Sequence, residues 1–209
     1  MDIAFLLKGL ILGFSIAAPV GPIGVLCIRR TLASGFPSGI LSGLGAATAD
    51  AFYGGVAAFG LTFVSTFLVG GQIWLRVVGG LFLLYLGLRI FLSPPPEKPA
   101  SASTRGLAGA FASTFFLTLT NPATIISFAA VFAGFGLGAS GGSTADASLL
   151  VVGVFAGSAL WWLLLASGVT LLRSRLDYRR MGWINKLSGA IIIVFGLITL
   201  ASLYSWSNS

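Results

Sequence analysis

Six long apolar segments constrain the fold of this chain more than any other feature. Each holds roughly 20 mostly apolar residues, the length that crosses a hydrocarbon layer about 30 Å thick. Backbone N–H and C=O groups cannot be left open to lipid, so we predict that the segments are helices. The predicted spans are Phe5–Ile28, Gly39 to about Phe63, Ile73–Phe91, Leu107 to about Phe135, Leu149–Leu172 and Ile184 to about Tyr204.

The composition excludes most other classes of protein. Of the 209 residues, 56% are hydrophobic and only 8% are charged, whereas a soluble domain carries about 25% charged residues. There is one cysteine and no histidine, so a disulfide framework is excluded and zinc sites lack their usual ligands. Without histidine or paired carboxylates, the usual acid–base constellations are missing. We therefore predict neither an enzyme nor a bound cofactor or metal.

A polar linker at 93–106 divides a single membrane domain, 1–209, into two halves. Three consecutive prolines, Pro94 to Pro96, cannot continue a helix. The halves, 1–92 and 107–206, match weakly when the chain is shifted by 110 residues, and a shift of 100 residues places Pro22 on Pro122. A repeat of three spans is odd, so the second half enters the membrane from the opposite side.

The predicted fold is thus an all-α membrane protein with six transmembrane helices, arranged as two inverted three-helix repeats. Inverted repeats are typical of secondary transporters, whose substrate sites lie near the midplane between the halves. The alternative is a duplicated membrane scaffold that carries no substrate.

The basic residues predict the orientation of the spans. Ten of the twelve Lys and Arg residues fall on the face that follows spans 1, 3 and 5, and only Lys8 and Arg76 fall on the other. By the positive-inside rule the richer face is cytoplasmic, so both termini are expected to be periplasmic or extracellular. The charge is divided over three short loops, which argues against nucleic acid and for contact with anionic lipid heads. The ten are Arg29, Arg30, Arg89, Lys98, Arg105, Arg173, Arg175, Arg179, Arg180 and Lys186.

Two prolines around a glycine predict that span 1 is broken near the bilayer centre. Proline removes a backbone donor and clashes with the preceding turn, and Pro22 suits the first turn of a new half-helix. The N–H groups of Ile23, Gly24 and Val25 would then point into the break and favour a carboxylate. The alternative is a packing kink supported by neighbouring helices. The predicted substrate-binding residues here are Pro19, Gly21, Pro22, Ile23 and Gly24.

Span 4 contains a counterpart, Thr120-Asn121-Pro122. We predict a second broken helix whose N–H groups face the first break across a pseudo-two-fold axis. The Asn121 amide can donate and accept hydrogen bonds, so Asn121 and Pro122 complete the predicted site. The alternative for Asn121 is an ordinary interhelical hydrogen bond.

Asp50 is the only acid deep in any predicted span. Such an acid usually marks a substrate or proton pathway. It could bind an ammonium group when ionised and carry a proton otherwise, which makes Asp50 the candidate for proton coupling. The alternative is a protonated Asp50 bonded to a carbonyl or hydroxyl group, with Thr48 and Tyr53 as candidate partners. No basic residue is predicted at the same depth.

Small residues recur every four positions at Gly35, Gly39, Gly43 and Ala47. This spacing lets helices approach closely, either within the fold or between two copies, so a homodimer stays open as a partner. Trp162 lies deep in span 5, where core packing is preferred to a place in a cavity wall.

Several of these motifs together resemble the LysE/RhtB family of amino-acid exporters. They are Pro19-Val20-Gly21-Pro22, the run 29–35, the Gly43-x-Gly45-x4-Asp50 pattern, the run 79–87 and Thr120-Asn121-Pro122. The family usually has Pro-Gly-Pro where Val20 intervenes here. The resemblance implies export of amino acids or related small metabolites across the bacterial inner membrane, driven by the proton gradient or membrane potential. Its matched motif residues are Pro19, Gly21, Pro22, Asp50, Asn121 and Pro122.

Two other functions compete with amino-acid export. An exporter of a divalent cation such as cadmium would have only Asp50 and Cys27 as ligands, which is few for a metal site. A scaffold or assembly protein would tolerate Asp50→Ala with only a change in stability.

Overall fold

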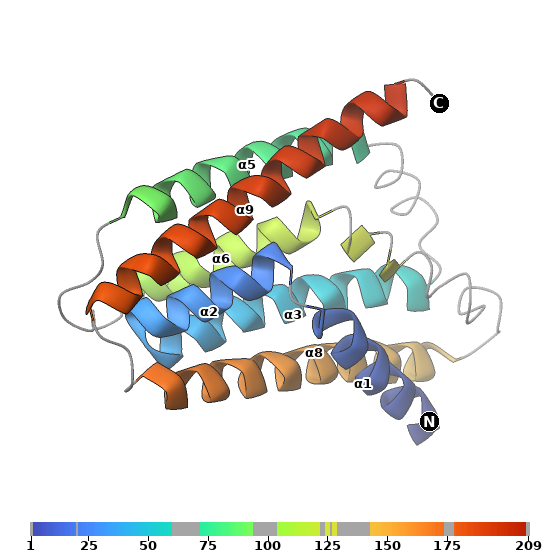
Figure 1. Cartoon of the computed structure of the whole chain (residues 1–209). Coiled ribbons are helices and arrows are strands. Elements are labelled where there is room, and N and C mark those ends of the chain that lie inside the picture. The colour runs from blue at the N-terminus through green and yellow to red at the C-terminus, as the bar shows by residue number, and fades with distance from the viewer. Residues whose placement is uncertain are drawn as a thin grey trace.

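The computed structural model describes residues 2–19, 21–59, 72–93, 104–121, 124–125, 127–128, 143–173 and 178–207. Within these ranges the regular structure is helical and no strand occurs, as predicted. Figure 1 shows the long helices running mostly side by side, with the start of α1 and the end of α9 at the same end of the bundle. The helices are α1 (Ile3–Ala17), α2 (Pro22–Ser34), α3 (Phe36–Ala58), α5 (Gln72–Leu92), α6 (Thr104–Leu119), α8 (Thr144–Arg173) and α9 (Tyr178–Ser207).

Three described helices are long and apolar enough to cross a membrane: Ile73–Leu92, Thr144–Leu172 and Gly182–Leu203. The bent pair α1 and α2 makes a fourth span if it is counted as one. Large apolar side chains such as Trp74, Leu171 and Leu187 lie exposed on the outside of the bundle. This surface suits lipid rather than water, and the protein is an integral membrane protein. The predicted spans 2 and 4 run partly into residues outside the description, at 60–63 and 129–135.

Local sequence signals set the boundaries of the first three helices. The Asp2 carboxylate accepts a hydrogen bond from the Ala4 N–H at 2.9 Å and caps α1. Pro22 is the first residue of α2, where its missing N–H costs nothing. Gly35 has φ of 89° between α2 and α3. That conformation is open to glycine, and it turns the chain sharply back on itself.

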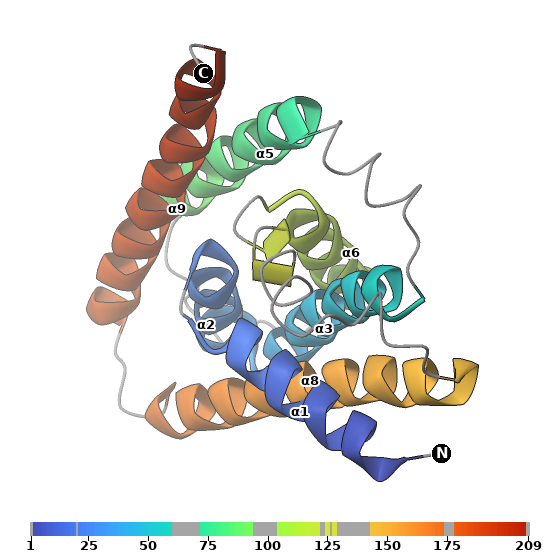
Figure 2. The same cartoon turned by 90° about the vertical axis from the view of Figure 1, so that its right-hand side faces the viewer.

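Figure 2 shows α2, α3 and α6 lying between the α5–α9 pair and the α1–α8 pair. Backbones approach closely in both outer pairs because glycines form the contacts. A methyl group at Gly13 would overlap the carbonyl oxygen of Val154, and one at Gly157 would overlap that of Leu10. Gly9 lies against Leu150 and Gly13 against Val154, so the residue numbers rise together and α1 and α8 are parallel.

Helices α3 and α6 are also parallel, because Gly45 lies against Phe111 and Tyr53 bonds to Leu119. In α3 and α8, Gly43 faces Trp162 while Gly54 faces Val154, so these helices are antiparallel. Gly39 lies against Thr31 of α2. Gly39 and Gly43 of the predicted small-residue stripe therefore make contacts inside the chain. The homodimer stays a prediction.

Arg29 and Arg30 correct the expected end of the first span. The sequence placed both in a loop at the membrane edge, but they lie inside α2 and are partly buried. The arginine side chain explains the difference, because its long apolar stem can lie between helices while its guanidinium reaches polar partners. Topology alone is therefore an incomplete account of these two charges.

Candidate functional site

A cavity of about 500 Å³ lies where α1 gives way to α2. Its size falls in the range of small-molecule sites. Residues of α1, α2, α3, α5, α6, α8, α9 and the short segment after Asn121 line the cavity. Its lining residues are Ile16, Ala17, Pro19, Gly21, Pro22, Ile23, Gly24, Ala46, Asp50, Arg76, Leu83, Thr118, Asn121, Thr124, Ser127, Trp162, Phe195, Ile198, Thr199 and Ser202.

The predicted break in the first span is present. Helices α1 and α2 meet at an angle of 81°, and α2 begins at Pro22. The Val25 N–H donates to the Gly21 carbonyl at 3.1 Å, which starts the hydrogen-bond ladder of α2. The expectation that the Val25 N–H faces the break is therefore wrong. Ile23 and Gly24 occupy the first turn, whose N–H groups have no intrahelical acceptor, and both residues line the cavity.

A second interruption borders the same cavity from the other half of the chain. Helix α6 ends at Leu119, two residues before Asn121. The Ile125 N–H donates to the Asn121 carbonyl at 3.2 Å, the same spacing as between Val25 and Gly21. Pro122 and Val20 lie outside the described residues. A new helical turn thus starts at Asn121 in the way that α2 starts at Gly21.

Asp50 lies on the cavity wall with 3% of its surface exposed. The Ser158 hydroxyl of α8 donates to the Asp50 Oδ2 at 2.7 Å. The Trp162 Nε1–H donates in turn to the Ser158 Oγ at 3.2 Å. Trp162 belongs both to the apolar core and to the cavity wall, so the preference for core packing alone was too narrow.

The two partners expected for Asp50 bond elsewhere. The Thr48 hydroxyl donates to the Leu44 carbonyl at 2.8 Å, one turn back in α3. The Tyr53 hydroxyl donates to the Leu119 carbonyl at 2.6 Å, at the end of α6. Both were chosen for closeness in sequence, whereas the actual donor comes from 108 residues away. Tyr53 instead satisfies a carbonyl that the end of α6 leaves without an intrahelical donor.

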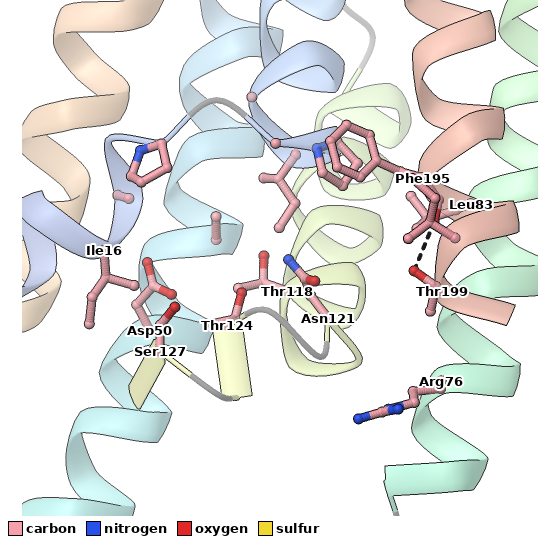
Figure 3. Close-up of a pocket in the computed structure, with 18 of the residues that line it drawn as sticks. Ile16, Asp50, Arg76, Leu83, Thr118, Asn121, Thr124, Ser127, Phe195 and Thr199 are labelled. Atoms are coloured by element: carbon pink, nitrogen blue, oxygen red, sulfur yellow. Dashed lines mark hydrogen bonds between the residues drawn. The ribbon is translucent and has the colours of Figure 1, made fainter. Parts of the chain in front are cut away.

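Arg76 is a cavity residue that the sequence assigned only to topology. It is 9% exposed and its Nη1 donates to the Ser202 Oγ of α9 at 3.3 Å. Figure 3 shows Asp50 and Arg76 on different sides of the cavity, with Thr118, Thr124 and Asn121 between them in that view. Arg76 therefore lines the same cavity as Asp50, from near the start of α5. The available signal was that Arg76 falls inside an apolar span.

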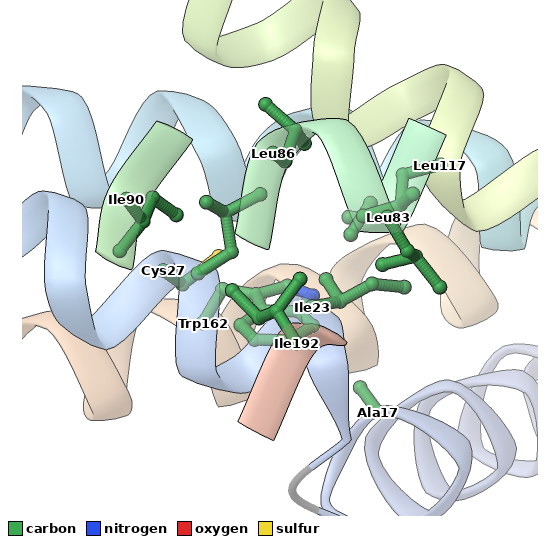
Figure 4. Packing of buried hydrophobic residues seen from close by; sticks show 12 residues of the cluster. Ala17, Ile23, Cys27, Leu83, Leu86, Ile90, Leu117, Trp162 and Ile192 are labelled. Carbon is green, nitrogen blue, oxygen red and sulfur yellow. The ribbon is translucent and has the colours of Figure 1, made fainter. Parts of the chain in front are cut away.

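One end of the bundle is closed beside the cavity. Figure 4 shows a buried apolar cluster in which Ile23 and Leu83 of the cavity wall meet Cys27, Leu86 and Ile90. Successive turns of α2 and α5 therefore run from the cavity into this cluster. Their C-terminal ends lie beyond it, at the end of the bundle that carries Arg29, Arg30 and Arg89.

The Arg30 guanidinium joins three helices at that end by hydrogen bonds. Its Nη1 lies 3.0 Å from the Ser42 Oγ of α3, and 3.0 and 2.9 Å from the Ala110 carbonyl and the Thr114 Oγ1 of α6. Its Nη2 donates to the Ser113 Oγ at 2.8 Å. Charge-assisted bonds of this kind are stronger than neutral ones. The contacts hold α2 against α3 and α6.

The two residues named as metal ligands do not share a site. Asp50 lines the cavity, whereas Cys27 is buried in the apolar cluster. Among the described residues, no group of three His, Cys, Asp or Glu side chains is placed to hold a metal ion.

Comparison with known proteins places the chain in a family. A 29% identical relative is the "Putative amino acid efflux protein YcgF" of Bacillus subtilis, which covers 91% of this chain and 92% of its own length. The "Uncharacterized membrane protein YahN" of Escherichia coli is 31% identical, over 81% of this chain and 77% of its own. A "Threonine efflux protein" of Salmonella typhi is 28% identical over 72% of this chain and 75% of its own length. No solved structure matches the chain.

The family model for the LysE type translocator matches residues 14–202, which include the break, Asp50, Arg76 and Asn121. A translocator family moves a solute rather than converting it, so the chain is a transport protein and not an enzyme. The chain belongs to the LysE type translocator family.

Proposed function

We propose that this protein exports an amino acid, or a closely related small metabolite, from the bacterial cytoplasm across the inner membrane. The observation that carries the proposal is the cavity, which combines a buried acid, a helix start and an amide in a LysE type translocator. Relatives named as amino-acid and threonine efflux proteins support the substrate class. An amino acid has one cationic and one anionic group, and the cavity offers a partner for each.

The substrate groups are assigned by charge. Asp50 binds the ammonium group, since an ionised carboxylate accepts up to several hydrogen bonds from it. The first turn of α2 at Ile23 and Gly24 binds the carboxylate, because free N–H groups and the helix dipole favour an anion there. Asn121 adds a donor or acceptor at the second break. Gly21 keeps the backbone close to the substrate.

Transport proceeds by alternating access between two inverted three-span halves. The contacts between the halves support this arrangement: α1 of the first half packs on α8 of the second, while α6 of the second packs on α3 of the first. Each first span of one half thus packs on the second span of the other. The two starts at Gly21 and Asn121 are 100 residues apart and have the same i to i+4 hydrogen bond.

The outer pair α5 and α9 supports the same two-fold relation. Gly80 contacts Gly196, and Gly87 contacts Gly189. A shift of 110 residues moves Gly80 to a position adjacent to Gly189, and the reverse shift moves Gly196 to a position adjacent to Gly87. The 110-residue shift between the halves therefore relates the Gly80–Gly196 pair to the Gly87–Gly189 pair to within one residue. A two-fold axis between inverted repeats requires such a relation.

The proposed orientation makes the Arg30 end cytoplasmic and both termini periplasmic or extracellular. The excess of basic residues at that end supports it. In this orientation Arg30 and the apolar cluster lie between the cavity and the cytoplasm. The proton gradient or the membrane potential drives export, with Asp50 as the candidate coupling group: it takes up a proton from the outer side when the ammonium group leaves and releases that proton to the cytoplasm before it binds the next ammonium group.

The test is counterflow in proteoliposomes of the purified chain, measured with each of the twenty amino acids as the labelled solute. Gly21→Leu should block it: a Cβ at Gly21 meets open space and φ is −102°, so the larger side chain enters the cavity region without strain. The matched control is Gly109→Leu on α6, where a Cβ also meets no described atom within 4 Å and which is not among the residues that line this cavity. Equal counterflow by the two variants, or none by the wild type with any amino acid, would overturn the proposal.

A further inference from the structure

The charges that line the cavity are few and separated. Asp50 and Arg76 are the only lining residues with a formal charge among those described. Figure 3 shows Asp50 on the side of Ile16 of α1 and Arg76 on the other side, on α5. The cavity therefore has an acidic side chain at one wall and a basic side chain at another, with neutral polar groups between.

The position of the Arg76 guanidinium is fixed from α9. Arg76 Nη1 donates to the Ser202 Oγ, and the Ser202 hydroxyl itself donates to the Thr199 carbonyl at 2.7 Å. Ser202 is uncharged, so this contact orients the guanidinium without cancelling its charge. Guanidinium carries five N–H donors in a planar fork and no acceptor. It therefore presents only donors and a positive potential to a solute.

A low-dielectric cavity discriminates strongly by charge. Two like charges a few ångströms apart repel by several kcal/mol at an effective dielectric constant of about 20. An amino acid held by its ammonium at Asp50 and its carboxylate at the start of α2 directs its side chain to the remaining wall. A cationic side chain there would meet Arg76, whereas a carbonyl or carboxylate oxygen would gain a donor.

We propose that Arg76 is a specificity-determining residue, which selects amino acids whose side chains end in a hydrogen-bond acceptor and rejects those with a cationic side chain. The inference rests on the proposed function and names the substrate class of the same cavity. Glutamine and glutamate fit this class, and lysine, of similar length, does not.

The test uses competition against counterflow, with the amino acid that the wild type transports fastest as the labelled tracer. Unlabelled glutamine, glutamate and lysine are the competitors, and the ratio of their half-inhibitory concentrations is compared within one preparation. In the wild type, the half-inhibitory concentration of lysine should be at least about tenfold higher than that of glutamine. Arg76→Glu should reverse the order of lysine and glutamate, and Arg76→Lys should keep the wild-type order.

The matched control is Lys8→Glu, the same reversal of charge on an exposed residue of α1 outside the cavity. It should leave the ratios unchanged. Should Arg76→Glu fail to fold, Arg76→Gln serves in its place and should bring lysine and glutamine to within about threefold of each other.

The outcomes separate this inference from the proposed function. A wild type that transports no amino acid contradicts the proposed function itself. A wild type that transports amino acids, while Arg76→Glu and Arg76→Gln keep the wild-type ratios, contradicts only the role of Arg76. Loss of all competition by both variants would show that Arg76 binds the carboxylate common to every amino acid, which also overturns its role in side-chain selection.

Discussion

Replacing Arg30 by glutamine should loosen the end of the bundle at which α2 meets α6. The guanidinium contacts three oxygen atoms of α6, those of Ala110, Thr114 and Ser113, at 3.0, 2.9 and 2.8 Å. Helix α2 belongs to the first proposed repeat and α6 to the second. These contacts therefore resist separation of the two halves at this end.

The size of the effect follows from what the substitution leaves behind. The Ser113 and Thr114 hydroxyls donate to the Gly109 and Ala110 carbonyls of their own helix at 2.6 and 2.8 Å. They keep these bonds without Arg30, so no hydroxyl donor is left unsatisfied. The loss is the net value of the charge-assisted bonds, about 1.5–3 kcal/mol for one such bond. Because the glutamine amide recovers part of it, we expect about 2 kcal/mol, or roughly a 30-fold rise in the open population.

The chain contains its own probe for this opening. Cys27 is the single cysteine, is 3% exposed and lies one turn before Arg30 on α2. A soluble maleimide can reach it only when this end opens, so the labelling rate follows the open fraction. Mass spectrometry of the purified protein in detergent micelles should show about a 30-fold faster rate in Arg30→Gln.

The control is Arg89→Gln, which removes one positive charge from an exposed side chain at the same end. Its labelling rate should stay within about twofold of the wild type. Circular dichroism at the labelling temperature checks that both variants remain folded. A rate for Arg30→Gln as slow as that of Arg89→Gln would refute the role of Arg30 in closing this end.

Two further predictions concern packing and the site. Gly13→Ala places a methyl group on the carbonyl oxygen of Val154 and should lower the free energy of unfolding by about 1–3 kcal/mol. The control is Gly168→Ala, whose methyl group meets open space and should leave the stability unchanged. Thermal unfolding measures both variants, and equal stability would contradict the close packing of α1 on α8. Ser158→Ala removes the hydroxyl that donates to Asp50 and should slow counterflow about tenfold with a folded protein; an unchanged rate would show that this contact has no part in transport.

The parts of the fold that the sequence predicted depend on local chemistry. Pro19, Gly21 and Pro22 predicted the break because proline acts on its own turn, wherever the helix lies in the fold. Asp50 was identified because an acid in an apolar run is costly without a compensating environment. Apolar runs predicted helices because backbone N–H and C=O groups cannot be left without partners in lipid. Each signal is contained within a few neighbouring residues.

The parts that the sequence missed depend on contacts between distant segments. Ser158 is 108 residues from Asp50 and looks like any small polar residue of a membrane helix. Arg30 and Arg76 were counted as topology signals because the positive-inside rule ignores depth and partners. Only the packing of α2 on α6, and of α5 on α9, reveals that one arginine closes an end and the other lines the cavity.

The most direct test of the central claim compares Asp50→Asn with Asp146→Asn in counterflow of the transported amino acid. Asp146 is an exposed acid at the start of α8, so the same substitution there removes a charge without touching the cavity. Loss of the ionic partner for the ammonium group should cut counterflow by Asp50→Asn at least about tenfold, while Asp146→Asn keeps the wild-type rate. Wild-type counterflow by a folded Asp50→Asn protein would contradict the claim that amino acids cross the membrane through this cavity.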